Sequence, residues 1–172
     1  MKRAFLVLGP ESSGTRLMTR ILMAVGCHGT DAHFNQPFDG GVPGNGPDLA
    51  VWRRSIPHDR QWARIESMVR SLRSAGYEVE SIVTMRDWHA MCRSQVAMGH
   101  VADYKTANAN LQEAYPHIFT GLARVNCPFR TASYDSLVRR PRAFLRVLLE
   151  QLELPFPNVL ENIYDGNDKW YA

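Results

Sequence analysis

A turn of small and hydroxylated residues near the N-terminus has the composition of a phosphate-binding loop. The segment 9–16 is Gly-Pro-Glu-Ser-Ser-Gly-Thr-Arg, and it lies between a short apolar stretch and a helical pattern. Such a loop directs successive backbone N–H groups, and the positive end of the following helix, at one anion. Gly9 and Gly14 keep Walker A spacing, but Thr15 stands at its lysine and Arg16 at its magnesium-holding hydroxyl. The turn predicts a phosphate site that lacks the usual metal ligand, with a plain helix cap as the alternative.

A second pair of polar residues lies after another apolar stretch. Arg86 ends the run Ile82–Met85, and Ser94 follows Arg86 by eight residues. An arginine at the end of a strand and a serine two turns into the next helix can reach the same phosphate. The arginine supplies a charged fork and the serine a hydroxyl.

Apolar stretches and helical patterns alternate along the chain. The pattern predicts strands over residues 4–8, 49–52, 79–84 and, more weakly, 129–134. It predicts helices over 17–25, over 62–72 with an Asp59 cap, after an Asp87 cap, over 101–124 with an interruption near Pro116, and from Pro141 to Leu152. A long loop rich in glycine and proline is expected over 27–47.

This alternation predicts a fold class and the position of the site. It indicates one α/β domain over residues 1–172, a three-layer αβα structure with a mainly parallel sheet, like the P-loop NTPases. Ligands of such sheets bind beyond the carboxyl ends of the strands. We therefore expect the turns 9–15, 53–58 and 86–87 to converge.

Composition excludes several other classes. The net charge of +3 is too small to indicate nucleic-acid binding. No apolar run approaches the roughly 18 residues of a membrane span, and the five-residue stretch 4–8 is too short for a signal peptide. The three cysteines form no CxxC pair, which favours a reducing, cytoplasmic compartment. Cys27, His28 and His33 match no ordinary zinc spacing, so we expect no metal site.

Taken in order, the motifs resemble the sulfotransferases that use 3′-phosphoadenosine 5′-phosphosulfate (PAPS). That family has a strand–[KR]SGTT–helix start, then strand–RDP–helix with a serine eight residues after the arginine, and a late YEDL…P…LGLP segment. The matching residues here are Ser13–Thr15, Arg86 and Asp87 with Ser94, Tyr134–Leu137, and Pro141 with the leucine-rich run to Leu154-Pro155.

The resemblance implies a role for each matched position. Ser13, Gly14 and Thr15 would hold the 5′-phosphosulfate, and we expect the flanking Ser12 and Arg16 to bind the donor as well. Arg86 and Ser94 would hold the 3′-phosphate, and Tyr134 would contact the adenine. The tail Asn167–Tyr171 is a candidate for the family's glycine-rich C-terminal segment, which has no clear match.

One departure concerns the charge on the leaving group. The family has Lys or Arg immediately before Ser-Gly-Thr, and this chain has Ser12. Arg16, Arg53 or Arg54 could supply the missing charge. We therefore expect Ser12 and Arg16 to lie at the catalytic centre.

A hydroxyl acceptor, a small molecule or a glycan, needs a general base. The segment 52–58, Trp-Arg-Arg-Ser-Ile-Pro-His, resembles the family turn that carries the catalytic histidine. His58 is the first candidate, and His33 is the second. Since a sulfuryl group carries less charge than a phosphoryl group, we expect PAPS as donor, its product PAP (3′-phosphoadenosine 5′-phosphate) and no metal.

Two alternatives stay open at this point. A P-loop kinase for a small metabolite would use ATP and magnesium, against which the missing Walker lysine argues. A non-catalytic nucleotide-binding module would retain the fold without turnover, and Ser12 keeps that interpretation open.

Overall fold

The computed structural model describes residues 2–29, 46–58, 60–157 and 163–171. Most of the predicted loop, together with His33 and Asp59, lies outside these residues.

Four parallel strands form the sheet, in the order β2-β1-β3-β4. Their bounds are β1 (Lys2–Gly9), β2 (Leu49–Ser55), β3 (Tyr77–Met85) and β4 (Phe129–Ser133). β2 is three residues longer than the apolar pattern predicts, because Arg53, Arg54 and Ser55 continue the pairing with the end of β1. Because these three residues are polar, the apolar pattern does not reveal that the strand continues. They extend β2 to the edge of the sheet where the site lies.

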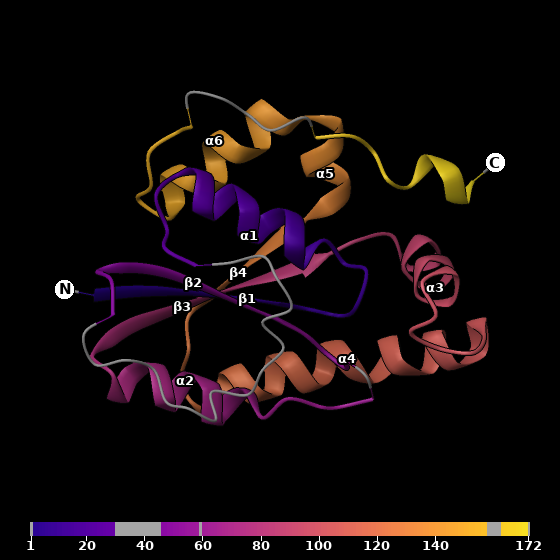
Figure 1. The fold of residues 1–172 in the computed structure, drawn as a ribbon, viewed down its shortest axis with the longest axis horizontal. Coiled ribbons are helices and arrows are strands. Elements are labelled where there is room, and N and C mark those ends of the chain that lie inside the picture. The colour runs from indigo at the N-terminus through magenta and orange to yellow at the C-terminus, as the bar shows by residue number, and fades with distance from the viewer. Residues whose placement is uncertain (1, 30–45, 59, 158–162, 172) are drawn as a thin grey trace.

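Helices cover both faces of the sheet (Figure 1). One face carries α1 (Thr15–Ala24), α5 (Tyr134–Arg139) and α6 (Pro141–Gln151), and the other carries α2 (Ile65–Ser74) and α4 (Tyr104–Arg124). Side chains of β1 alternate between the two cores: Leu6 and Leu8 pack toward α2 and α4, and Phe5 and Val7 toward α1 and α6. The three-layer αβα fold with a parallel sheet is confirmed.

One helix, α3 (Trp88–Ala97), lies beyond the carboxyl ends of the strands and packs on α4 (Figure 1). Asp87 caps it as predicted, accepting a hydrogen bond from the Ala90 N–H at 2.8 Å. The C-terminal segment, with the short 3₁₀ turn η1 (Asp168–Trp170), returns to the same end of the molecule. The carboxyl end of the sheet is therefore walled by elements far apart in sequence.

Three local predictions were wrong. α4 runs through Pro116 without interruption, because fully buried Ala114 and Ile118 hold the helix against the core on either side. The lost hydrogen bond of a proline costs less than this packing stabilises. Trp62 precedes α2 instead of belonging to it, and packs against α4. Tyr134 begins α5 and does not end β4, since the Ser133 hydroxyl caps a new helix there.

No helix in the described ranges is both long and apolar enough to cross a membrane.

The three cysteines are buried free thiols, and burial raises the pKa of Cys27 to about 12.

Candidate functional site

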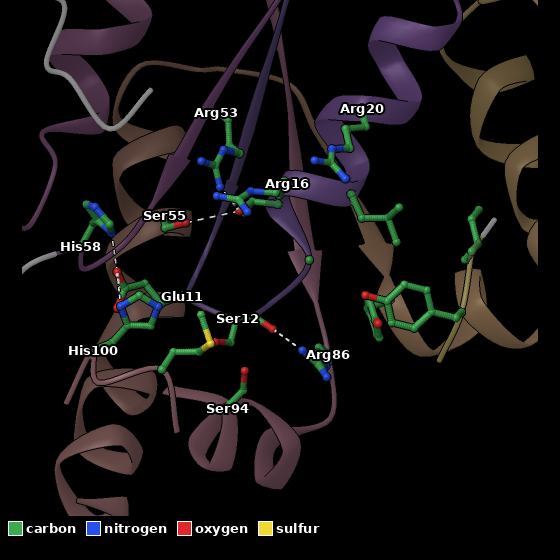
Figure 2. Close-up of a pocket in the computed structure, with 17 residues that line it drawn as sticks. Glu11, Ser12, Arg16, Arg20, Arg53, Ser55, His58, Arg86, Ser94 and His100 are labelled. Atoms are coloured by element: carbon green, nitrogen blue, oxygen red, sulfur yellow. Dashed lines mark hydrogen bonds and ion pairs between the residues drawn. The ribbon is translucent and has the colours of Figure 1, made fainter. Parts of the chain in front are cut away.

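A pocket of about 440 Å³ lies at the carboxyl ends of β1, β2 and β3. Its walls come from the turn after β1, the first turns of α1, the end of β2, the second half of α3 with the residues after it, and the C-terminal segment. Figure 2 labels ten of the lining residues. The predicted convergence of three strand-ending turns is confirmed.

The turn after β1 has the backbone of an anion-binding loop. Ser12 and Gly14 both take positive φ angles, 69° and 100°. A Cβ atom on Gly14 would lie 2.7 Å from Cδ2 of Tyr134, so only glycine allows the tyrosine ring to approach the loop. The loop and the ring therefore form one continuous wall.

Ser13 supports this loop from below. Its side chain is fully buried, and its Oγ lies 2.7 Å from both the Pro10 carbonyl oxygen and Oγ1 of Thr84 on β3. Gly9 has no side chain because a Cβ there would lie 2.3 Å from the same Thr84 oxygen. The Ser13 hydroxyl thus tethers the loop to the sheet and does not line the pocket.

Cationic side chains gather on one side of the loop. Arg16, Arg20 and Arg53 line the pocket there (Figure 2). Arg53 is 6% exposed, and its Nη1 lies 3.5 Å from Oγ1 of Thr15, which in turn lies 3.3 Å from Ser55 Oγ. This wall can neutralise an anion held on the loop.

Arg54 was also considered as a source of the positive charge that Ser12 lacks, but it lies away from the pocket. It is buried one residue further along β2 and does not line the pocket. Because side chains alternate along a strand, it shares the opposite face of the sheet with Trp52, which packs toward α2 and α4.

Arg86 and Ser94 both line the pocket, on the opposite side of the loop from Arg16 and Arg53 (Figure 2). The guanidinium of Arg86 donates to the Ser12 carbonyl oxygen at 2.9 Å and lies 4.5 Å from the centre of the Tyr134 ring. Arg86 therefore joins the loop to the tyrosine as well as facing the pocket.

The C-terminal segment closes this side. Arg86 Nε donates to Asn167 Oδ1 at 2.6 Å and Nη2 to the Gly166 carbonyl oxygen at 3.0 Å. The Gly166 N–H donates to the Tyr134 hydroxyl at 3.0 Å, and Asn167 Nδ2 donates to Asp135 Oδ1 at 2.5 Å. A second hollow of about 430 Å³ lies between this segment and Ser94.

A further contact holds the very end of the segment. The Tyr171 hydroxyl donates to the Asp87 carboxylate at the start of α3, which lowers the pKa of Asp87. The same hydrogen bond is the main reason that the pKa of Tyr171 is raised to about 12. The tail singled out in the sequence thus packs against residues next to the pocket, Asn167 against Arg86 and Tyr171 against Asp87.

His58 lies at the other end of the pocket, on the turn after β2. Its Nδ1 contacts Oε1 of Glu11 in the phosphate loop, and Nδ1 of His100 lies 3.7 Å from the same oxygen (Figure 2). The histidine predicted as a base is therefore held by a carboxylate, and the second candidate, His33, lies outside the described residues.

The structure brings together the predicted residues Ser12, Gly14, Thr15, Arg16, Arg86, Ser94, Tyr134 and His58 around one pocket. Sequence reasoning missed Glu11 and His100. A carboxylate inside a phosphate-binding turn was a signal that could have drawn attention to Glu11. Nothing in the sequence marks His100, which reaches the site only because α3 folds over the loop.

Within the described part of the chain, no group of three or more His, Cys, Asp or Glu side chains is placed to hold a metal ion.

Comparisons with known proteins place the fold. No protein-family model matches the chain, and no curated protein matches its sequence. Among solved structures, the sulfotransferase domain from the curacin biosynthetic pathway is similar, with a TM-score of 0.60 and 13% identity over 96% of this chain and 81% of that one. The sulfotransferase domain from the Synechococcus PCC 7002 olefin synthase has a TM-score of 0.61 and 14% identity over 100% of this chain and 88% of that one. The chain has the sulfotransferase fold, a P-loop-like α/β architecture.

Proposed function

We propose that this protein transfers the sulfuryl group of PAPS to a hydroxyl acceptor, a small molecule or a glycan. The observation that carries the proposal is the distribution of charge in the pocket. Arg16 and Arg53 lie on one side of the phosphate loop, and Arg86 lies with Ser94 on the other. A donor with phosphates at both its 3′ and 5′ positions needs cations at two separate places, whereas the phosphates of ATP form one chain.

The residues present fit that donor. Arginine has five N–H donors, and three of those on Arg86 bond to protein oxygens, so two remain for phosphate oxygens. Gly14, which has no side chain, lets the Tyr134 ring pack directly against the loop. The Tyr134 ring, which contacts the loop at Gly14 and the guanidinium of Arg86, also lines the pocket, where a flat base could pack against it.

The chemistry asks for positioning and charge stabilisation. His58 accepts the proton of the acceptor hydroxyl as its oxygen bonds to sulfur and the bond from sulfur to the bridging oxygen breaks. Arg16 and Arg53 stabilise the negative charge that develops on the departing phosphate, by analogy with phosphoryl transfer. Arg16 thereby supplies the charge that Ser12 lacks.

The acceptor would enter from the side of His58. Ser55, His58 and His100 lie at that end (Figure 2), and Met98, which lines the same pocket, is 67% exposed. A pocket that combines an apolar side chain with two imidazoles fits an uncharged hydroxyl compound. Incubation with ³⁵S-labelled PAPS and a panel of phenols, alcohols and oligosaccharides would identify the class.

Nucleotide binding tests the proposal first. Thermal unfolding would be followed with PAP, and separately with ATP and magnesium, in the wild type, Arg86→Ala and Ser94→Ala. Arg142→Ala, on the exposed face of α6, is the matched arginine control. A ligand at 100 times its Kd adds about 2.7 kcal/mol, which in a chain of this size is an increase in Tm of roughly 5–11 °C.

We expect PAP to give this stabilisation in the wild type and in Arg142→Ala, and much less in Arg86→Ala and Ser94→Ala. Ser94→Ala is the sharper test, because Arg86 also bonds to the loop and the C-terminal segment. Stabilisation by ATP with magnesium alone would overturn the proposal in favour of a kinase. Stabilisation by PAP with no transfer to any acceptor or to water would favour a non-catalytic module.

A further inference from the structure

The phosphate loop contains a carboxylate, that of Glu11, although a loop that binds an anion would be expected to avoid negative side chains. Glu11 is 6% exposed and lines the pocket beside Ser12. A negative side chain in a loop built to hold phosphate repels the ligand, and a buried charge is expensive without a partner. The position of Glu11 therefore calls for a role other than ligand binding.

The contacts of Glu11 join three separate elements. Its Oε1 contacts Nδ1 of His58 on the turn after β2 and lies 3.7 Å from Nδ1 of His100, which follows α3. Its backbone carbonyl accepts a hydrogen bond from Nε2 of Gln95 at 2.9 Å, and Gln95 is itself 2% exposed. Glu11 is thus held in place through both its backbone and its side chain. The centres of the two imidazole rings lie 6.4 Å apart (Figure 2).

We infer that Glu11 is a positioning residue that sets the tautomer of His58 for proton transfer. An ionised carboxylate only accepts hydrogen bonds, so the Nδ1 atom that it contacts carries the proton. The lone pair of the neutral ring is then on Nε2, the nitrogen that can take a proton from a hydroxyl. This inference rests on the proposed function, in which His58 is the base.

The proton balance follows from that assignment. His58 Nε2 gains the proton of the hydroxyl as the oxygen–sulfur bond forms and the bond from sulfur to the bridging phosphate oxygen breaks. The ring becomes an imidazolium with both nitrogens protonated, and the Glu11 carboxylate stabilises its charge. The proton leaves to solvent when the sulfated product departs. Arg16 and Arg53 also line the pocket, and the Glu11 carboxylate is a negative group in direct contact with the ring.

The test uses Glu11→Gln, which keeps the shape of the side chain and removes its charge. Glu78→Gln, an exposed position at the opposite end of β3, makes the same chemical change far from the pocket. Two quantities would be measured in each variant: the rate of sulfate release from PAPS with water as the acceptor, and the affinity for PAP. Long-range ¹H–¹⁵N spectra of histidine-labelled protein would report the tautomer of His58.

In Glu11→Gln we expect sulfate release to fall by roughly 10²–10⁴-fold, the size of effect expected when a base loses its orientation. PAP should bind at least as tightly as to the wild type, since a negative charge has left the loop. The Nδ1-protonated form of His58 should dominate in the wild type and in Glu78→Gln, and lose that dominance in Glu11→Gln.

An unchanged rate and tautomer in Glu11→Gln, with PAP still bound, would overturn the inference. If that variant does not fold, the wild-type spectrum decides, because a His58 ring protonated at Nε2 is incompatible with it. A wild type that neither binds PAP nor releases sulfate would instead refute the proposed function, and the tautomer would still report whether Glu11 holds His58.

Discussion

The contact between Gly14 and Tyr134 gives a sharp test of how the site is built. Gly14 and Gly26 have nearly the same positive φ angle, 100° and 102°. A Cβ atom at Gly26 would meet nothing within 4 Å, whereas one at Gly14 would lie 2.7 Å from the Tyr134 ring. The pair Gly14→Ala and Gly26→Ala therefore separates backbone strain from displacement of the ring.

The expected magnitudes follow from these two terms. Alanine in the left-handed region costs about 1–2 kcal/mol, so Gly26→Ala should lower the Tm by roughly 2–8 °C in a chain of this size. Gly14→Ala adds about 1–3 kcal/mol for overpacking, so its Tm should fall by roughly 4–20 °C. Urea unfolding would give the free energies independently of temperature.

The two variants should differ more in ligand binding than in stability. Tyr134 carries the Arg86 guanidinium on its face and accepts a hydrogen bond from the Gly166 N–H, so moving the ring disturbs both. We expect the stabilisation by PAP to be lost in Gly14→Ala and retained in Gly26→Ala. Equal losses of Tm in the two variants, with a full response to PAP in both, would refute the role assigned to the tyrosine wall.

Three further predictions concern the charge, the C-terminal segment and the core. Arg16→Ala should slow sulfate release at least tenfold, and Ser12→Lys in that background should restore part of the rate; no recovery would contradict the role given to Arg16. Tyr171→Phe should raise the pKa of Asp87 toward 3.8. Because that pKa is lowered in the folded state, its stabilisation is present above about pH 4 and lost on acidification, so stability measured at pH 3 and pH 6 should differ less in the variant. Ile118→Ala should cost about 2–5 kcal/mol in urea unfolding without changing PAP affinity.

Apolar periodicity was enough to predict the sheet and the position of the site. A buried parallel strand is apolar on both faces, so β1 and β3 stand out in the sequence, and their carboxyl ends must meet. The motif residues Gly14, Arg86 and Ser94 were found because they lie at fixed distances from those strand ends. Local chemistry and topology were sufficient for this part of the site.

Other features depended on contacts that no local pattern contains. The end of β2 is polar, because Arg53 faces the pocket instead of the core. The unbroken course of α4 through Pro116 depends on burial of the neighbouring turns, which propensity alone does not measure. His100 reaches the site only because of the path that the chain takes after α3. The sequence could therefore have singled out Glu11 by its unusual position in the loop, but it could not have shown the contact of Glu11 with His100.

The serine at position 12 has a different meaning once the neighbouring elements are in place. The motif lacks a cation at this position, yet Nη1 of Arg53 on β2 lies 3.5 Å from Oγ1 of Thr15, and Arg16 follows Thr15 in the first turn of α1. The Ser12 carbonyl, meanwhile, accepts the hydrogen bond that connects the loop to Arg86. The positive charge beside the loop therefore comes from residues that follow Ser-Gly-Thr or lie on β2, which a motif of consecutive residues does not include. Since charge stabilisation depends on where charges lie around the reacting atoms and not on which residue carries them, the substitution at Ser12 is compatible with the proposed transfer.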